Sequence, residues 1–282
     1  MYDGVSLSDA EGAGVLQRAT GELRLSVKRR GDLSVLDGLR QAGCLKARFP
    51  RPVASGWFDA TTLNTSGGVV GGDRLNSEIS VGEGARATIA AQAAERYYRA
   101  LPGHPPSMVR TAVSVAGGAA AEWLPQETIL FDRCALDRRL TIDVAPDAWF
   151  LGCELLVFGR AAMGERVITA RLRDVIEVRR GDDFLLHDAI RLEGEVDRVL
   201  ERTATAGGAR AVATIAHVAP DAESRLDAVR AVLLSPNSGA SAWNGMLIAR
   251  ILAPDSASAR EIVIAVLAVL RGGRPMPRVW LC

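Results

Sequence analysis

Residues 167–187, Val-Ile-Thr-Ala-Arg-Leu-Arg-Asp-Val-Ile-Glu-Val-Arg-Arg-Gly-Asp-Asp-Phe-Leu-Leu-His, carry the pattern that decides the fold class. Apolar and polar side chains alternate on both sides of Arg180-Gly-Asp-Asp183, which is typical of two β-strands joined by a turn. A connection this short fits a hairpin, whereas parallel neighbours in an α/β sheet need a crossover of a dozen or more residues. The stretch therefore predicts antiparallel strands.

The same alternation recurs from about Glu22 to Leu200, for example in the strand-like segments at residues 23–28 and 140–144. Glycine, proline, aspartate and asparagine separate these segments, as expected for turns. We predict a mainly β protein with an extensive, largely antiparallel sheet in β-helical-type layers. No internal repeat or linker divides the chain, so the expectation is a single domain over residues 1–282, with about the first 20 residues flexible.

Helical patterns are confined to the C-terminal part of the chain. Apolar residues at helical spacing follow Asp221, a candidate N-cap, and stop at Ser235-Pro236. Ser258 and Glu261 have the spacing of a capping box before an apolar stretch that ends at Arg271-Gly272-Gly273. Two α-helices are therefore predicted, mostly toward the C-terminus.

Composition excludes several classes of protein. The 34 basic and 33 acidic side chains give a net charge of +1, which argues against a protein dedicated to nucleic acid or anionic membranes. The N-terminus lacks the apolar run of a signal peptide, and the longest apolar run near the C-terminus is too short to span a bilayer. We expect a cytoplasmic protein with reduced thiols.

Histidine and cysteine are scarce, which argues against a store for metal ions that prefer nitrogen and sulfur ligands. No C-x-x-C pair is present and no histidine has a second histidine or cysteine three or four residues away, so no metal or redox motif is predicted. No role is assigned to these seven residues, which are His104, His187, His217, Cys44, Cys134, Cys153 and Cys282.

The most unusual segment is Leu63-Asn-Thr-Ser-Gly-Gly-Val-Val-Gly-Gly-Asp-Arg74. Gly67 and Gly72 have the spacing of the two P-loop glycines, but Asp73 and Arg74 replace the lysine and the hydroxyl residue that a phosphate site needs. One interpretation is a tight turn that uses glycine for positive φ angles. The other is that the turn holds Asp73 as a cation ligand or ion-pair partner.

Two further clusters combine carboxylates with turn residues. Glu122-Trp-Leu-Pro-Gln-Glu-Thr-Ile-Leu-Phe131 is followed by Asp132, and its acids are either solvated loop residues or a pair for acid–base chemistry. Gly159-Arg-Ala-Ala-Met-Gly-Glu165 places an arginine and a glutamate on a glycine-flanked loop. That loop is either a surface hairpin with an Arg160–Glu165 ion pair or a functional element.

These segments, together with Ala91-Gln-Ala-Ala-Glu-Arg-Tyr-Tyr-Arg99 and Arg274-Pro-Met-Pro-Arg-Val-Trp280, resemble in their order the UreD family of urease accessory proteins, called UreH in some bacteria. The resemblance covers about residues 22–282. It implies a mostly β fold with two helices and a scaffold without enzymatic activity. It also implies a complex with a UreF-type helical protein and a UreG-type GTPase that docks on apo-urease, dimeric through UreF, so that nickel reaches the urease active site.

The resemblance further implies that nickel(II) is carried transiently through an internal passage, with no tightly bound cofactor. Asp73 and Glu165 are the lead candidates for contact with the ion, and Glu122, Glu127 and Glu154 are weaker ones. Oxygen ligands suit transit because they hold such an ion less tightly than thiolates or imidazoles. The expected structural residues are Gly67, Gly68, Gly71, Gly72, Arg74, Arg160 and Gly164, and the expected partner-binding residues are Arg278 and Trp280.

Two outcomes separate this hypothesis from its alternative. If Asp73 and Glu165 contact nickel, replacing either by alanine in a folded, partner-bound chain should impair urease activation. Deleting the residues after Arg271 should abolish the soluble complex with UreF. The alternative is an independent β-rich protein that binds or hydrolyses glycosides with Glu122, Glu127 and Asp132, and it predicts turnover by the isolated chain.

Overall fold

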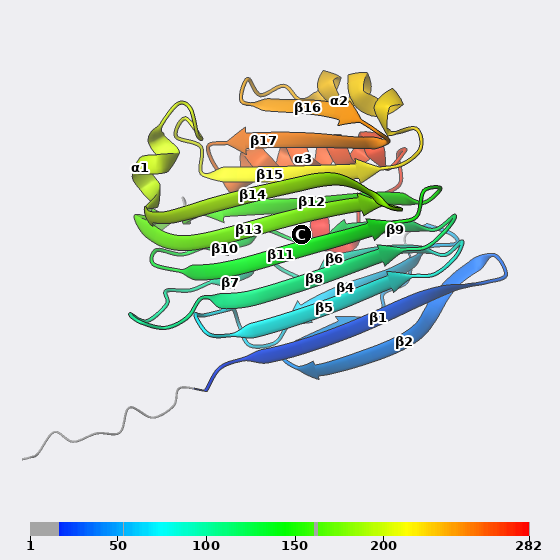
Figure 1. Cartoon of the computed structure of the whole chain (residues 1–282), viewed down its shortest axis with the longest axis horizontal. Coiled ribbons are helices and arrows are strands. Elements are labelled where there is room, and N and C mark those ends of the chain that lie inside the picture. Colours follow the sequence, from blue (N-terminus) through cyan, green and yellow to red (C-terminus); the bar gives the residue numbers. More distant parts are fainter. Residues whose placement is uncertain (1–16, 53, 161–162, 282) are drawn as a thin grey trace, which may run out of the picture.

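The computed structural model describes residues 17–52, 54–160 and 163–281, and it shows two β-sheets stacked face to face with helices behind one of them (Figure 1). Sheet A has seven strands, which in spatial order are β14 (Asp183–Glu195), β13 (Thr169–Arg180), β11 (Ala135–Val144), β8 (Ser107–Val115), β5 (Arg74–Val81), β1 (Thr20–Arg30) and β2 (Leu33–Gly43).

Sheet B has ten strands. Eight follow one another in the order β16 (Ser238–Trp243), β17 (Met246–Ala253), β15 (Ala211–Val218), β12 (Trp149–Phe158), β9 (Ala120–Leu124), β6 (Arg86–Ala91), β4 (Phe58–Asn64) and β3 (Leu45–Arg48). The other two are β10 (Thr128–Leu130), which pairs with β12, and β7 (Glu95–Tyr97), which pairs with β10. Within the motif at residues 91–99, Glu95–Tyr97 thus form a strand.

The mainly β class is confirmed, but the strand directions differ from the prediction. Residues 167–187 do form an antiparallel pair, β13 and β14, whereas the central strands of both sheets pair in parallel. The chain alternates between the sheets from β4 to β13, so it returns to each sheet by way of a strand of the other. A strand of the opposite sheet therefore replaces the helical crossover that parallel neighbours ordinarily require.

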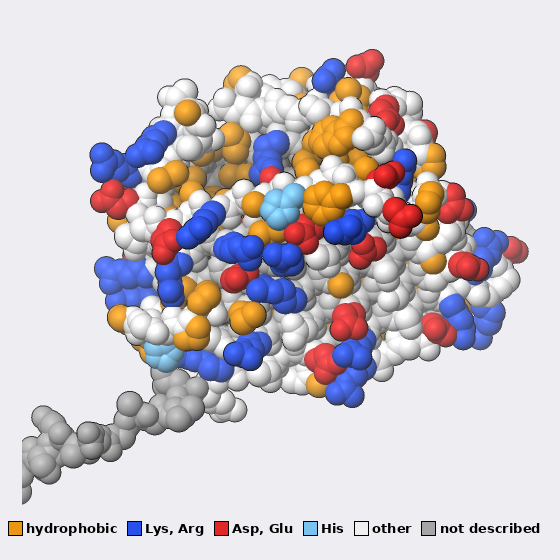
Figure 2. All heavy atoms as spheres, in the orientation of Figure 1, with side chains coloured by type: hydrophobic (Ala, Val, Ile, Leu, Met, Phe, Trp, Pro, Cys, Tyr) orange, Lys and Arg blue, Asp and Glu red, His pale blue; other side chains and the backbone are white. Residues whose placement is uncertain are grey.

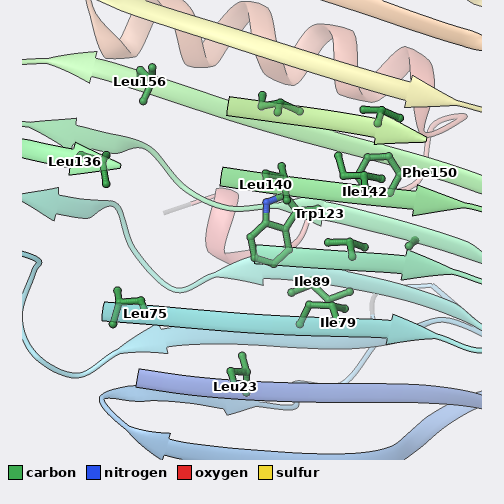
Figure 3. Packing of buried hydrophobic residues seen from close by; sticks show 14 of the residues in the cluster. Leu23, Leu75, Ile79, Ile89, Trp123, Leu136, Leu140, Ile142, Phe150 and Leu156 are labelled. Carbon is green, nitrogen blue, oxygen red and sulfur yellow. The ribbon is translucent and has the colours of Figure 1, made fainter. Parts of the chain in front are cut away.

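The main core lies between the two sheets. Strands of both sheets contribute one face to it, including Ile79 and Leu140 from sheet A and Ile89, Trp123 and Phe150 from sheet B. Figure 3 shows these side chains filling the space between the strands. The alternation recognised in the sequence is therefore the alternation between this core and the opposite face of each sheet.

A second core lies on the far side of sheet B, where α3 (Ser256–Leu270) and α2 (Leu226–Val232) pack. Strand β15 is buried along its whole length because the first core covers one of its faces and α3 covers the other. A short helix, α1 (Val196–Glu201), and the 3₁₀ turns η2 (Ala222–Arg225) and η3 (Arg278–Trp280) complete the helical elements of the described ranges. The predicted position of the helices toward the C-terminus is confirmed.

The predicted start of α3 is wrong by three residues. The N-cap is Asp255, whose side chain accepts a hydrogen bond from the backbone N–H of Ser258 at 2.8 Å. A carboxylate at this position satisfies one of the free N–H groups of the first turn, so the helix starts before Ser258. The expected flexible segment, residues 1–20, lies mostly outside the described residues, and within them no helix has the length and apolarity to cross a bilayer.

Candidate functional site

Asp73 is buried at the start of β5, where it fixes the glycine-rich turn. Its two carboxylate oxygens accept hydrogen bonds from the backbone N–H groups of Ala19, at 2.8 Å, and Val70, at 2.9 Å. The carboxylate therefore ties the residues that precede β1 to the turn. Both oxygens that would contact a cation already have backbone partners.

The glycines of this segment lie at positions where a side chain would be strained or crowded. Gly67, Gly68 and Gly72 have positive φ angles, and a Cβ atom on Gly68 would collide with the Tyr98 ring. A Cβ atom on Gly71 would lie 2.9 Å from the Cβ of Ala100. The turn interpretation is thus supported, and Arg74 follows as the exposed first residue of β5.

Glu122 is fully buried on the helix-facing side of β9 and is surrounded by cations. Arg271, at the end of α3, binds it through Nε at 2.9 Å and Nη2 at 3.0 Å. Arg274 also donates to Oε1, and the Thr88 hydroxyl donates to Oε2 at 2.7 Å. The Arg274 guanidinium lies 4.1 Å from the centre of the Trp57 ring. Glu122 therefore joins the C-terminal segment to sheet B.

Glu127 makes a similar connection a few residues later. Arg260 of α3 donates to Glu127 at 2.9 Å, to the side chain of Gln126 at 2.7 Å and to the carbonyl oxygen of Trp280 at 2.7 Å. Trp280 is buried and its indole N–H donates to the carbonyl oxygen of Leu124 at 3.0 Å. The C-terminal tail is thus fastened beside the core, and we call the set Glu122, Glu127, Arg260, Arg271, Arg274 and Trp280 the C-terminal clamp.

Glu165 lies at the surface in an ion pair with Arg160. Their side-chain atoms are 2.7 Å apart, and the Arg160 guanidinium lies 4.6 Å from the centre of the Phe131 ring. Gly164 has a positive φ angle, as the predicted loop requires. Glu165, Arg160 and Gly164 border a hollow of about 720 Å³.

A buried ion-pair network crosses the space between the two sheets. Arg138 of β11 binds Asp174 of β13 through two hydrogen bonds of 2.7 Å and binds Glu154 of β12 at 2.6 Å. The Trp123 indole N–H donates to the other oxygen of Glu154 at 2.9 Å. Burial raises the pKa of Glu154 despite the nearby guanidinium, whereas the pKa of Arg138 is raised because its two acidic partners outweigh its burial. We call Arg138, Glu154 and Asp174 the inter-sheet triad.

The inter-sheet triad borders a cavity of about 190 Å³ between the sheets. Its polar lining comes from both sheets and from the loops beside them: Thr62, Asn64, Ser77, Gln92, Glu95, Tyr97, Thr111, Gln126, Thr128, Arg138 and Glu154. Asn64 donates to Glu95 at 3.0 Å, and burial raises the pKa of the Glu95 carboxyl. Leu23, Leu75 and Trp123, which Figure 3 shows among the core side chains, form part of the apolar wall.

The histidines and cysteines form no metal cluster. Within the described parts of the chain, no group of three or more histidine, cysteine, aspartate or glutamate side chains is placed to hold a metal ion. His217 is buried, its Nδ1 lies 3.0 Å from the Phe150 carbonyl oxygen, and burial lowers its pKa. Burial raises the pKa of Cys134 to about 12, which makes it a poor nucleophile.

The other histidines contact charged neighbours. His104 Nδ1 lies 2.8 Å from the Arg18 guanidinium, and His187 Nδ1 lies 3.1 Å from Glu177. Cys44 and Cys153 are free thiols whose pKa values are raised by burial. Cys282 lies outside the described residues.

Comparison with known proteins identifies the family. Residues 19–281 match the family model described as UreD urease accessory protein. The chain belongs to the UreD family. A protein of Azorhizobium caulinodans named urease accessory protein UreD is 44% identical over 271 residues, which cover 95% of this chain and 98% of the relative. One of Methylorubrum populi, named urease accessory protein UreD 2, is 44% identical over 273 residues, covering 94% of this chain and 91% of the relative.

UreD membership implies a role in urease maturation, and the related proteins are named as accessory proteins. Within this UreD chain, Glu154 alone of the five predicted acids lines the inter-sheet cavity. Sequence reasoning missed Glu95, Tyr97 and Arg138. The spacing of Leu136, Leu140 and Ile142 was a usable signal for Arg138, because it is on the same face of the strand.

Proposed function

We propose that this UreD-family chain acts in urease maturation as a scaffold without enzymatic activity, through which nickel(II) passes transiently on its way to apo-urease. The observation that carries the proposal is the cavity between the sheets, whose lining combines the carboxylates Glu95 and Glu154 with hydroxyl groups. Oxygen donors exchange a divalent ion more readily than thiolates or imidazoles do. A lining of this kind suits an ion that must leave again.

The inter-sheet triad has a defined part in the proposed passage. Arg138 lies between two carboxylates, so its charge is offset by Glu154 on one side and Asp174 on the other. A divalent ion that approaches Glu154 competes with Arg138 for one carboxylate oxygen and with the Trp123 indole N–H for the other. Glu95 accepts a hydrogen bond from the neutral Asn64 side chain. An ion that approaches this carboxylate oxygen therefore displaces a weaker partner than an arginine.

The glycosidase alternative has little geometric support. Glu122 is held by two arginines and Glu127 by Arg260, while Asp132 accepts the backbone N–H of Thr169 at 2.9 Å. A retaining or inverting pair needs two carboxyl groups that converge on one substrate bond. These three carboxylates instead have separate protein partners.

The proposed partners are a UreF-type protein, a UreG-type GTPase and apo-urease, in a cytoplasmic complex that contains two copies of this chain joined through UreF. The exposed side of α3 and the tail around Arg278 are the proposed UreF surface. Several apolar side chains there are only partly buried, including Ile262, Val269 and Val279. Such a surface suits a helical partner.

The passage is tested by urease activation with purified components and limiting nickel. Glu95→Gln removes a charge from the cavity lining, and Thr111→Leu makes the lining less polar without altering charge. Both variants should bind their partners normally but activate urease severalfold more slowly. Glu78→Gln removes an exposed carboxylate from the outer face of sheet A, so it is the matched control and should retain wild-type activation.

Wild-type activation by both cavity variants would contradict the passage between the sheets. The two original candidates keep their own test, since Asp73→Ala and Glu165→Ala should impair activation if those side chains contact the ion. Loss of activation by Asp73→Ala counts only if the variant remains folded, because Asp73 holds the turn before β5.

A further inference from the structure

One corner of sheet A carries many more arginines than acids. We define the basic corner as the exposed and half-exposed arginines at this end of the sheet and the three acids among them: Arg18, Arg74, Arg99, Arg133, Arg171, Arg173, Arg191, Asp132, Asp137 and Glu193. Seven arginines against three acids leave a surplus of four positive charges, although the whole chain has a net charge of only +1. Figure 2 shows blue side chains gathered at the left end of this face.

The basic corner is one continuous surface. Arg171 borders two adjoining hollows, of which one is also lined by Arg99 and Arg133 and the other by Arg173 and Arg191. The loop around His104 joins Arg18 to this surface. Arg171 donates to the His104 carbonyl oxygen at 2.7 Å, and the Arg18 guanidinium lies 2.8 Å from Nδ1 of the His104 ring. Arginines from distant parts of the sequence thus meet at one place.

The three acids of the basic corner pair with only some of its arginines. Arg133 lies 3.5 Å from Asp132, Arg173 lies 3.6 Å from Asp137, and Arg191 lies 3.3 Å from Glu193. Asp137 also pairs with Arg110, outside the corner, at 3.0 Å. Among the described residues, no ion pair joins Arg74, Arg99 or Arg171 to a carboxylate. The positive charge of the corner is therefore poorly compensated within the chain.

Apolar side chains lie among these arginines. Leu101 is 44% exposed in the loop that precedes β8, and Met108 is 39% exposed beside Arg74, its partner in the strand register. Arginine and methionine are enriched in protein interfaces, and a charged surface speeds association with an oppositely charged partner. A divalent cation would be repelled here, so the basic corner is not a nickel entrance.

We propose that the basic corner docks an acidic surface of apo-urease. This inference rests on the proposed function, in which the chain must hold its client and its accessory partners at the same time. The α3 helix and the tail lie behind sheet B, whereas the basic corner belongs to sheet A (Figure 1). Because the two surfaces are on different sheets, a helical partner at α3 leaves the basic corner free for the client.

Charge reversal tests this docking. The full chain, purified with its UreF-type partner, is immobilised and its dissociation constant for apo-urease is measured at 50 and 200 mM NaCl, roughly the range over which exposed charges become screened. The triple variant Arg171→Glu, Arg173→Glu, Arg191→Glu should bind about tenfold or more weakly and lose most of the salt dependence of the wild type. A control with the same charge change, Arg29→Glu, Arg30→Glu, Arg225→Glu, should bind within about twofold of the wild type.

Equal binding by the triple variant and the wild type would overturn the proposal, as would equal weakening by the control. A short DNA duplex tests whether the basic corner binds nucleic acid instead of an acidic protein surface. Binding of the duplex by the wild type, without binding of apo-urease, would also overturn it. Nickel-dependent urease activation by the wild type is measured separately, so failure of the proposed function is distinguished from failure of the docking surface.

Discussion

At the scale of single residues, the environment decides what a carboxylate does. Glu122 and Glu165 both lie within the range that matches the UreD family, yet Glu122 has no solvent exposure and Glu165 is half-buried and paired with one arginine. Removing one partner of a buried ion pair leaves an uncompensated charge, whereas an exposed pair contributes little. The same substitution should therefore cost much more stability at Glu122 than at Glu165.

Glu122→Ala should lower the free energy of unfolding by about 3–5 kcal/mol, because Arg271 is left buried without its main acceptor. Glu165→Ala, the matched control, should lower it by only about 0–1 kcal/mol. Urea unfolding at pH 7.5 measures both values. Similar losses in the two variants would contradict the structural role of Glu122.

His217 predicts a pH dependence of stability. Burial lowers its pKa in the folded chain, so the unfolded chain binds the proton more readily. The neutral ring is compatible with folding above the ordinary histidine pKa of about 6.5, and the wild type should lose stability as the pH falls through that value toward the lowered pKa.

His217→Gln should lack this share of the pH dependence. Urea midpoints of the variant and the wild type are compared at pH 7.5 and 5.5. The stability difference between the two proteins isolates His217, since all other titrating groups are common to both. If the stability difference between the variant and the wild type were the same at pH 7.5 and pH 5.5, His217 would not change its protonation on unfolding.

At the scale of elements, α3 and the tail depend on the C-terminal clamp. Arg274 and Trp280 reach back to Glu122 and to Leu124, while the carbonyl oxygens of Arg274 and Pro275 accept hydrogen bonds from Arg271. The tail is therefore part of the core behind sheet B. A partner protein that docks on this side would contact a surface that the tail helps to build.

Removal of residues 274–282 should sharply reduce the soluble yield of the chain and its thermal midpoint, because it exposes the apolar surface beneath Trp280. Removal of residues 281–282 alone keeps every clamp residue and serves as the control, with an expected midpoint within a few degrees of the full chain. Thermal unfolding and size-exclusion chromatography measure the effects. If the chain without residues 274–282 were as stable as the full chain, the stabilising role of the C-terminal clamp would be refuted.

At the scale of the whole molecule, the inter-sheet triad is a polar link across the main core. Arg138 belongs to sheet A and Glu154 to sheet B, so their ion pair joins the two layers. Buried ion pairs of this kind often add little net stability, but the loss of one partner is costly.

Arg138→Met should destabilise the chain by about 3–5 kcal/mol at pH 7.5, because it leaves the buried carboxylates of Glu154 and Asp174 without their cation. The pKa of Glu154 is already raised, so protonation at lower pH removes its charge in the folded chain. The stability lost by the variant should therefore be partly recovered between pH 7.5 and 5. Equal losses at both pH values would argue against an ionised triad.

Much of the fold was predictable because the signals for it are local. Alternation identified β1, β11, β13 and β14 of sheet A, the glycines marked the turn before β5, and helical spacing located α2 and α3. Strand direction was not predictable, since residues 167–187 describe one hairpin correctly but carry no information about how the other strands meet. Parallel pairing arises only because successive strands enter different sheets.

The sequence by itself determined the mainly β class, the C-terminal helices and the family, because these depend on periodicity and on motifs within short stretches of chain. The tertiary structure alone decided which acids face the cavity and which are clamped. Glu95, Arg138 and Glu154 are separated in sequence by 43 and 16 residues and meet at one cavity through the stacking of the two sheets. A side chain's neighbours across a core are set by long-range packing, which no local pattern encodes.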